Sequence, residues 1–414
     1  MKNLLLTTTA ALGLASMASA EVDIAAVTAN YGDIALAGYE DSLVLAKDLR
    51  VALGELVESP SDATLNAAKA AWLRARVPYQ QTEAFRFGNP TVDDWEGKVN
   101  AWPLDEGLID YVEGDAGVNP ENPYASANVV ANTTLTVAGE TVDASAITPE
   151  LLESLHEVEG IEANVATGYH AIEFLLWGQD LNGTDAGNGA RTASDYDTEN
   201  CTNGNCDRRG EYLLAASDLL ISDLEDAVAN WSEGGQGRLD LAEGDPLVMA
   251  FTGLGSLSYG EQAGERMKLG LLLHDPEETH DCFADNSSMS HYYDGLGIRN
   301  VYTGRYVRID GSVVEGPSLM DVVAEKDEAL AINLLADMNH TMSALGALKT
   351  AQEAGTAFDQ LIGVGHPGNE LTQNAIDGLV AQTRNIERAV TVVGLEGVAI
   401  EGSDSLDNQS AVFE

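Results

Sequence analysis

A histidine and a glutamate lie three residues apart in an apolar stretch of this sequence. His170 and Glu173 fall within residues 163–177, where apolar side chains recur every three or four positions, a pattern that predicts a buried helix. This spacing puts both side chains on one helix face, with about 5–6 Å between their Cβ atoms. An imidazole nitrogen and a carboxylate oxygen that close can share one metal ion or one proton. A simple hydrogen bond is the commoner outcome, so the pair forms a site only if further ligands join it.

Those further ligands must come from neighbouring segments, because one helix supplies only two side chains to a metal ion. Carboxylates on or beside other predicted helices are the candidates, although ion pairs with arginines can occupy the glutamates instead. His280 and Asp281 form a second donor pair, for which hydrogen bonding within a loop is the simpler interpretation. The metal ligands that we predict are His170, Glu173, Glu83, Asp105 and Glu265, with Glu261 as a further candidate.

Common catalytic signatures are missing from the sequence. It contains no HExxH zinc motif, no GxSxG nucleophile elbow, no GxxxxGK(S/T) phosphate loop and no GxGxxG segment that opens a helix after a strand. These absences lower the weight of the common hydrolase and nucleotide-binding classes. No catalytic residue and no organic cofactor is predicted, and the question of enzymatic activity stays open.

The charge of the chain is strongly unbalanced, with 67 acidic and 21 basic residues and a net charge of −46. Such a field repels nucleic acid and anionic membranes and concentrates cations near the surface. Solubility in a salty environment explains most of this charge, so acidity supports a cation ligand only weakly. A nucleic-acid partner is not expected.

The N-terminus is typical of a secretory signal peptide. A basic start is followed by a short apolar run and a small-x-small end, which predicts cleavage after Ala20 and an exported, periplasmic protein. No later stretch approaches about 20 uninterrupted apolar residues, so no transmembrane segment is expected. No cysteine follows the cleavage site, which argues against a lipid anchor there.

Helical periodicity dominates the remainder of the chain. We predict an all-α fold of two helical-bundle halves related by internal duplication, with small β-hairpin insertions at 133–142 and 306–314. The predicted units are the signal peptide 1–20, an N-terminal bundle 21–190 that carries the His170 pair, and a C-terminal bundle 191–414. The main predicted helices cover 22–58, 62–85 with a kink at Pro78, 163–177, 209–231, 246–273, 318–350 and 369–393.

A loop rich in glycine, asparagine and aspartate, residues 180–209, separates the predicted halves. Its acidic residues suggest calcium, but they do not match the EF-hand pattern, so a solvated loop is the better interpretation. Cys201 and Cys206 within it can close a small disulfide in an exported protein, which would leave Cys282 unpaired or buried.

The segment Gly168-Tyr169-His170-Ala171-Ile172-Glu173 matches GxHxxE, and here the chain resembles a known family, the imelysin-like exported bacterial proteins, which include the iron-regulated protein A group. The resemblance extends to residues 82–88, 102–105, 260–267 and 281–286, and so covers most of the mature chain. It implies an all-helical, two-bundle fold with the signature near the interface of the halves, and a link to bacterial iron uptake. The family has been grouped with metallopeptidases because of HxxE, although the second histidine of the zincins is lacking.

Three functions follow from these observations. The first is an exported metal-binding protein that binds iron and passes it to membrane components of an uptake system; iron comes from the resemblance, because such nitrogen and oxygen ligands suit iron, zinc and manganese alike. The second is an HxxE-type zinc metallopeptidase, in which a carboxylate activates water. The third is a non-catalytic periplasmic binding or scaffold protein.

Overall fold

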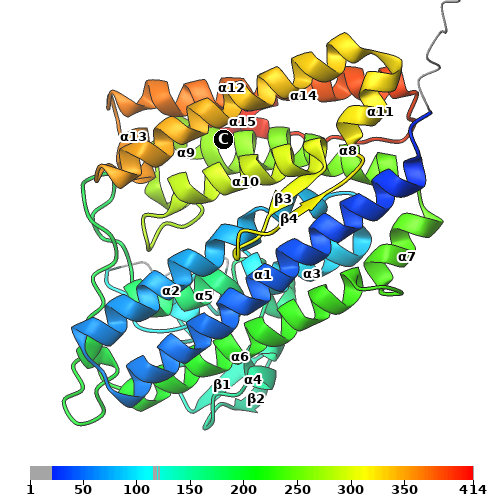
Figure 1. Cartoon of the computed structure of the whole chain (residues 1–414). Coiled ribbons are helices and arrows are strands. Elements are labelled where there is room, and N and C mark those ends of the chain that lie inside the picture. Colours follow the sequence, from blue (N-terminus) through cyan, green and yellow to red (C-terminus); the bar gives the residue numbers. More distant parts are fainter. Residues whose placement is uncertain (1–20, 115–118, 120–121, 414) are drawn as a thin grey trace, which may run out of the picture.

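The computed structural model describes residues 21–114, 119 and 122–413, and the predicted signal peptide 1–20 lies outside these residues. Most of the described chain is helical, and the helices form two packed groups that lie one above the other in Figure 1. Two short hairpins are the only sheets in this part of the chain. The predicted all-α fold with β-hairpin insertions is confirmed, and the internal duplication of the halves stays a prediction.

The lower group in Figure 1 is built on three long helices, α1 (Ile24–Glu58), α2 (Asp62–Gln80) and α6 (Cys206–Trp231). The Asp23 side chain accepts two amides of the first turn of α1 and so satisfies donors that a helix start leaves free. Both α2 and α6 pack along α1. The shorter helices of this group are α3 (Pro90–Asn100), α4 (Pro149–Leu155), α5 (Gly168–Trp177) and α7 (Gln236–Glu243).

The upper group contains α8 (Pro246–Ser256), α10 (Ser287–Thr303), α12 (Glu328–Glu353) and α14 (Gly368–Val393). Residues Leu257–Leu269 continue α8 as a π-helix, a rare conformation that is frequent at functional sites. α14 packs against both α12 and this π-helix. The remaining helices are α9 (Gly270–Leu273), α11 (Leu319–Lys326), α13 (Phe358–Ile362) and α15 (Asp404–Asp407).

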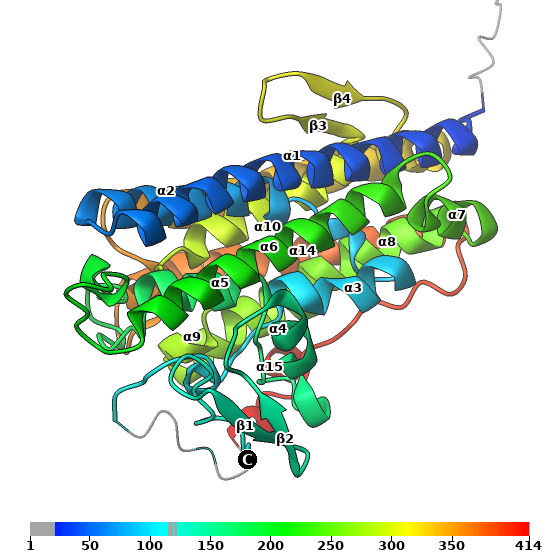
Figure 2. The same cartoon turned by 90° about the horizontal axis from the view of Figure 1, so that it is seen from below.

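The two hairpins lie where the sequence predicts them, on opposite sides of the molecule in Figure 2. The second hairpin crosses α1, where the buried Asp41 carboxylate accepts hydrogen bonds from the Tyr306 hydroxyl and the Ile309 amide. Both hairpins are antiparallel. Their strands are β1 (Thr134–Val137) with β2 (Glu140–Asp143), and β3 (Arg305–Val307) with β4 (Val313–Glu315).

The second predicted helix changes form near its end. α2 includes Pro78 and ends at Gln80, and the chain then forms a 3₁₀ turn at Glu83–Phe85. Proline lacks the amide of one helical hydrogen bond, which weakens the helix in this region. The kinked continuation to residue 85 is therefore a separate turn, and it orients Glu83 independently of α2.

The boundary between the halves stays a prediction. α6 follows the predicted division at 190 and 191 but packs against α1 and α5, which favours a later boundary, after α7. The long loop before α6 contains a Cys201–Cys206 disulfide, with Cα atoms 5.8 Å apart, and Cys282 is a free thiol. The disulfide closes the loop immediately before α6 begins.

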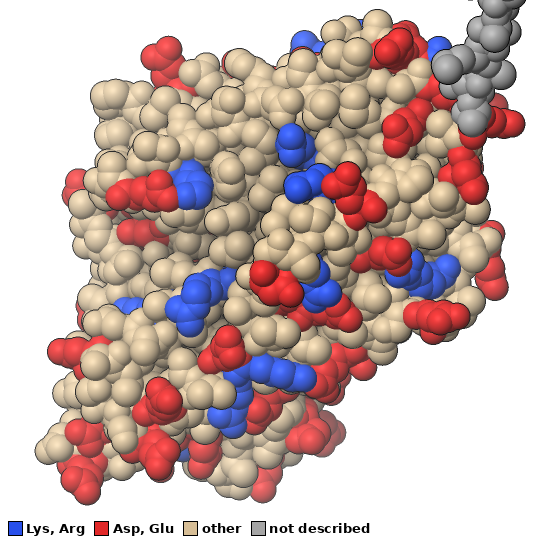
Figure 3. Space-filling model, viewed as in Figure 1, with Lys and Arg blue, Asp and Glu red and all other residues tan. Residues whose placement is uncertain are grey.

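Charged side chains are spread over both groups on the face that Figure 3 shows, and many basic groups lie next to acidic ones. Ion pairs join α1 to α6, where Lys47 pairs with Glu225 and Arg50 pairs with Asp218. Among the helices described, none combines the length and the apolar character that crossing a membrane requires.

Candidate metal centre

α5 carries the His170–Glu173 pair, and all ten of its residues are buried. The helix begins at Gly168, whose φ of 78° lies in the left-handed region. A Cβ atom at this position would lie 2.5 Å from the carbonyl oxygen of Val99, at the end of α3. Glycine is therefore required both by the backbone conformation and by the close approach of α3.

Two tryptophan and tyrosine contacts fix α5 against α2. The indole nitrogen of Trp72 donates to the carbonyl oxygen of Tyr169 at 2.9 Å, and the rings of Tyr79 and Tyr169 pack with centroids 4.9 Å apart. The guanidinium group of Arg76 lies 5.0 Å from the centroid of the Tyr169 ring. These contacts put His170, the next residue, between the two helical groups.

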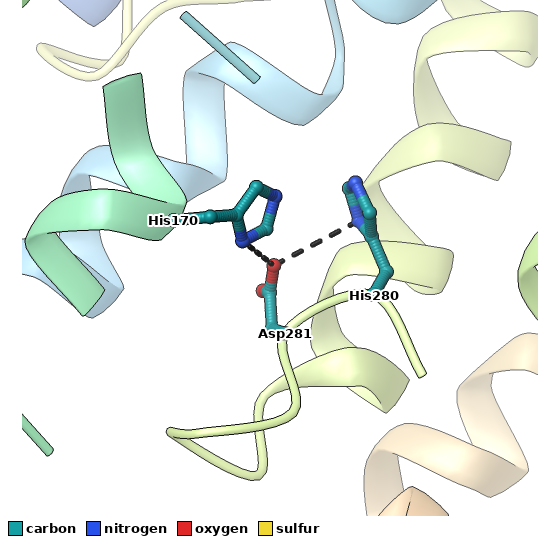
Figure 4. A group of neighbouring side chains, drawn as sticks. All are labelled: His170, His280 and Asp281. Carbon is teal, nitrogen blue, oxygen red and sulfur yellow. Dashed lines mark ion pairs between the residues drawn. The ribbon is translucent and has the colours of Figure 1, made fainter. Parts of the chain in front are cut away.

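Two histidines and an aspartate converge there, as Figure 4 shows. His170 comes from α5, whereas His280 and Asp281 come from the segment that precedes α10. One Oδ atom of Asp281 lies 4.0 Å from Nδ1 of His170 and 3.7 Å from Nδ1 of His280. All three side chains are buried, and their ligand atoms lie within 4.8 Å of one another. We call these three residues, together with Glu173, the His170 centre.

Glu173 contacts both sides of this centre. Its Oε2 atom lies 2.9 Å from Nδ1 of His170, a hydrogen bond in which either atom can be the donor. Its Oε1 atom accepts the amide of Ala284 at 2.9 Å. The glutamate of the motif therefore joins α5 to the segment that carries His280 and Asp281.

The donor atoms differ in how fully they are used. Asp281 accepts from Arg76 at 2.8 Å, from Asn286 at 2.7 Å and from Ser290. Both nitrogens of His280 have only long contacts. Nδ1 lies 3.4 Å from the side-chain nitrogen of Gln80, and Nε2 lies 3.5 Å from the side-chain nitrogen of Asn100 in α3. Nε2 of His170 is buried without a hydrogen-bond partner. The imidazoles thus retain free coordinating capacity, whereas the carboxylate is largely occupied.

Burial and the neighbouring guanidinium groups determine the charges of the centre. Burial, and then Arg76, lower the pKa of His170 to about 3, and burial with Arg266 lowers the pKa of His280 well below its ordinary value. Burial opposes ionisation of Asp281, but Arg76 holds its pKa below the usual range. Burial, and then Asp281, raise the pKa of Glu173 well above its ordinary value. At neutral pH the imidazoles are neutral, as metal ligands must be.

The other predicted ligands lie further out. Glu83 is buried, but its Oε2 accepts from Arg266 at 2.6 Å, which is the ion pair that competes with a ligand role. Glu265 is half-buried and lines a cavity beside His280. Asp105 accepts from Asn122 at 2.5 Å and is outside the group of close donors around His170. The ligand roles of these three residues stay predictions.

His280 and Asp281 are the residues whose importance the sequence argument underestimates. They are adjacent in the chain, so they were identifiable as a donor pair, but hydrogen bonding within a loop was the simpler interpretation. The stronger signal is that Asp281 begins the segment 281–286, which carries part of the family resemblance, and that His280 directly precedes it. Arg76 is one of the arginines of which the sequence indicates only that they can pair with carboxylates, and its partner Asp281 lies 205 positions away.

A cavity of about 450 Å³ connects His280 with the surface. Exposed residues such as Asp94 and Glu162 form part of its wall, so it reaches solvent. The charged groups in its wall are predominantly acidic: Asp93, Asp94, Glu96, Glu157, Glu162, Glu261 and Glu265 against Arg86 and Arg266. This lining favours the approach of a cation.

The residues present fit a transition-metal ion. Two neutral imidazoles and one ionised carboxylate form a borderline donor set that suits divalent iron, zinc or manganese. The unpartnered Nε2 of His170 is the kind of buried atom that a metal would satisfy. The opposing feature is Arg76, because a bound ion would share the Asp281 carboxylate with its guanidinium group.

Comparisons with known proteins show the family and the fold. The family model for imelysin matches residues 35–386. Iron-regulated protein A of Synechococcus elongatus is 38% identical over 60 residues, which amount to 14% of this chain and only 17% of that relative. A crystal structure from Parabacteroides distasonis, provisionally named an iron-regulated protein A precursor, has 18% identity and a TM-score of 0.64, and the match covers 91% of this chain and 97% of that one. At this identity the structural likeness shows the fold alone.

Proposed function

This chain belongs to the imelysin family, and from that premise we propose that it is an exported protein that binds a transition-metal ion, iron in its natural setting, at the His170 centre. In this proposal His170, His280 and Asp281 hold the ion as cargo, and Glu173 orients His170. The role in iron uptake is supported by the names of the relatives, which are iron-regulated proteins. Export is supported by the signal-peptide pattern at residues 1–20.

One observation carries the proposal: buried ligand atoms of two histidines and an aspartate, from segments 110 positions apart, lie within 4.8 Å of one another. Burying three polar side chains costs free energy unless each is satisfied, and Nε2 of His170 has no partner. A bound cation would supply that partner. The acidic cavity beside His280 gives a cation a route to the centre, and its charge disfavours an anionic iron chelate.

The role proposed for Glu173 follows from its two hydrogen bonds. Histidine ligands commonly use their second ring nitrogen to contact a carboxylate, which fixes the ring orientation. Glu173 is 2.9 Å from Nδ1 of His170 and is itself held by the Ala284 amide. The prediction that Glu173 is a ligand in its own right is open to the same experiment, because a ligand and an orienting group differ in the size of their effect.

The test is metal content, measured by mass spectrometry on tag-free protein after stripping and challenge with Fe²⁺, Zn²⁺ or Mn²⁺. We expect about one ion per chain, lost in His170→Ala and in His280→Ala. His340→Ala, which removes an exposed histidine of α12, is the matched control and should bind normally. Glu173→Gln should weaken binding about 10- to 100-fold if the residue orients His170. Wild-type protein without stoichiometric metal, or full binding by His170→Ala, would contradict the proposal.

The zinc peptidase is the second candidate, because it would use the same centre. It needs a free carboxylate to activate water, but Glu173 is held by Ala284 and Asp281 is held by Arg76. We therefore place metal binding first. Metal-dependent cleavage of a denatured protein, lost in Glu173→Ala, would favour the peptidase. A folded protein that binds a partner regardless of chelators would favour the scaffold hypothesis.

A further inference from the structure

Three aspartates from separate segments meet at a second position between the helical groups. Asp180 lies in the loop after α5, Asp285 lies just before α10, and Asp359 lies in α13. One carboxylate oxygen of each lies within 4.8 Å of the others. The three residues, which we call the aspartate cluster, include none of those in the His170 centre. We propose that the aspartate cluster binds a calcium-sized divalent cation.

Asp359 is the side chain that turns this acidic cluster into a site. It is only 4% exposed, and neither of its carboxylate oxygens has a hydrogen-bond partner of normal geometry. Burial raises the pKa of Asp359, and the nearby backbone amides of Gln360 and of Asp359 itself act in the opposite direction. Burial of an unsatisfied carboxylate is costly, and such groups in native proteins are usually paired or bound to a metal. An oxygen of Asp359 faces the oxygens of the other two aspartates, where a cation would satisfy it.

The other two carboxylates are fixed by their own segments. Asp180 uses one oxygen to accept the backbone amide of Asn182 at 2.9 Å and its side-chain amide at 2.6 Å, so its second oxygen is free. Asp285 has a φ of 56°, in the left-handed region that aspartate adopts more readily than most non-glycine residues, and its Oδ1 atom is buried without a partner. Each of these two residues therefore keeps one carboxylate oxygen that is available to a ligand.

Contacts outside the cluster hold the three segments together. The Gly189 amide, in the loop that contains Asp180, donates to the carbonyl oxygen of Phe283 at 3.0 Å. Thr184 of the same loop packs against Gly363, which follows α13, so closely that an added Cβ atom would lie 3.2 Å away. The geometry of the cluster is thus set by the fold and does not depend on a flexible loop meeting its ligands by chance.

No basic side chain of the described chain forms an ion pair with any of the three carboxylates. Their shared negative charge has a physical consequence: burial, and then Asp359 and Asp180, raise the pKa of Asp285 to about 8, and burial raises the pKa of Asp359 to about 6. Nearby Glu277 adds to the same field, and burial with Glu106 raises its pKa to about 7. A divalent cation is the simplest group that would compensate this charge.

The chemistry of the ligands selects the cation. Carboxylate oxygens are hard donors, and calcium takes them at 2.3–2.6 Å, so two opposed oxygens are about 5 Å apart. Magnesium at 2.0–2.1 Å would require about 4 Å and strict octahedral geometry. The aspartate cluster has no nitrogen or sulfur donor, which separates it from the transition-metal chemistry of the His170 centre.

The test is a calorimetric titration of CaCl₂ into the metal-stripped protein. We expect one calcium per chain, with affinity at least tenfold lower in Asp359→Asn and in Asp285→Asn. Asp185→Asn, which removes an exposed carboxylate of the same loop, is the matched control and should bind as wild type. His170→Ala should also bind calcium normally, which separates this result from the metal test of the His170 centre. Absence of calcium binding at millimolar concentration, or equal affinity for MgCl₂, would overturn the proposal.

Thermal unfolding supplies a second readout that a purely structural role would not produce. Without calcium, Asp359→Asn should melt at the same temperature as wild type or higher, because it removes a buried unpaired charge. With CaCl₂, calcium binding should stabilise the wild type, so that the wild type melts at a higher temperature than Asp359→Asn. An order that is unchanged by calcium would contradict cation binding at this position.

Discussion

The His170 centre and the aspartate cluster both include residues of the segment 280–286, yet their buried charges are compensated in different ways. In the His170 centre, Asp281 is paired with Arg76 and hydrogen-bonded to Asn286. In the aspartate cluster, the carboxylate of Asp359 has neither kind of partner. The first site therefore compensates its charge internally, whereas the second requires a cation from outside.

This difference determines what each site can select. With Asp281 already neutralised, affinity at the His170 centre must come mainly from the free imidazole nitrogens, which favour iron, zinc and related ions. The aspartate cluster offers only charge and oxygen, which favour calcium. One segment can thus present two unlike ligand sets to two unlike cations. The predictions below test that contrast, from the largest expected effect to the smallest.

Removal of Arg76 tests whether the His170 centre truly depends on internal compensation. Arg76→Ala leaves Asp281 buried and unpaired, and the loss of one partner of a buried ion pair costs about 3–5 kcal/mol. We expect a loss of this size in the free energy of unfolding, measured by urea denaturation.

The control for that experiment is Arg50→Ala, because the Arg50–Asp218 pair is partly exposed to solvent. Exposed pairs contribute under about 1 kcal/mol. Equal losses for the two variants would show that Asp281 does not rely on Arg76, and the contrast with the aspartate cluster would disappear.

Gly168→Ala tests whether the two sites depend on different supports. The new Cβ atom would combine a left-handed backbone, which costs about 1–2 kcal/mol, with a clash against Val99 that costs about 1–3 kcal/mol. We expect a total loss of about 2–5 kcal/mol by urea denaturation, together with weaker transition-metal binding as α5 shifts. Calcium binding should be unaffected.

The matched control is Gly160→Ala. Gly160 has a similar φ of 73°, but an added Cβ atom would meet nothing within 4 Å. It should show only the backbone cost and no change in metal binding. If Gly168→Ala behaves in the same way, close packing of α5 on α3 is not what positions His170.

Local sequence patterns were sufficient to predict much of the fold. The helix that begins at 22 in the prediction begins at Ile24, and both hairpins overlap the predicted ranges, extending at most one residue beyond them. These features depend on apolar periodicity and on turn residues, which are local. The π-helix at Leu257–Leu269 was predicted only as part of a longer helix, because apolar periodicity does not distinguish π-helical from α-helical winding.

The sites were predictable only in part. His170 and Glu173 share one helix, so their spacing brings them together. Asp281 reaches His170 through a fold that also pairs it with Arg76, and no local pattern encodes that contact. In the aspartate cluster only Asp180 fell within the loop considered for calcium, and its two partners lie more than 100 positions away in the chain. Contacts between residues far apart in the chain cannot be predicted from sequence periodicity.

Asp223→Asn sharpens the contrast, because Asp223 is a lone buried carboxylate. It is 5% exposed, its Oδ2 atom has no partner, and burial raises its pKa to about 6. The folded state therefore binds the proton more tightly than the unfolded state, so stability falls as pH rises from about 4 to about 6. With allowance for solvent screening, the variant should gain about 1–2 kcal/mol at pH 7 and nothing at pH 4.

Urea denaturation at the two pH values measures this effect, with Glu211→Gln on the exposed side of α6 as the control. The gain of Asp223→Asn in the free energy of unfolding should be the same with and without CaCl₂, whereas the stability of Asp359→Asn relative to wild type should change with CaCl₂. If calcium changed the gain of Asp223→Asn, the calcium-dependent reversal of stability expected for Asp359→Asn would not be specific to the aspartate cluster.

The smallest effect concerns communication between the sites. Asp285 lies in the same segment as His280, and the Ala284 amide beside it donates to Glu173 of the His170 centre. Calcium at the aspartate cluster would restrain this segment and so reduce the ordering cost of transition-metal binding. We expect CaCl₂ to raise zinc or iron affinity about two- to fivefold, which is at or below the lower end of typical allosteric couplings.

Calorimetric titration of the metal-stripped protein, with and without CaCl₂, measures this coupling, and each metal must change the affinity of the other by the same factor. Direct repulsion between two cations acts in the opposite direction, but the three aspartates neutralise calcium locally, so the ordering effect should dominate. The factor should persist in Asp185→Asn and vanish in Asp359→Asn. If calcium changed zinc or iron affinity by the same factor in both variants, calcium would act at another site. If calcium lowered that affinity, repulsion between the two cations would outweigh the ordering of the shared segment.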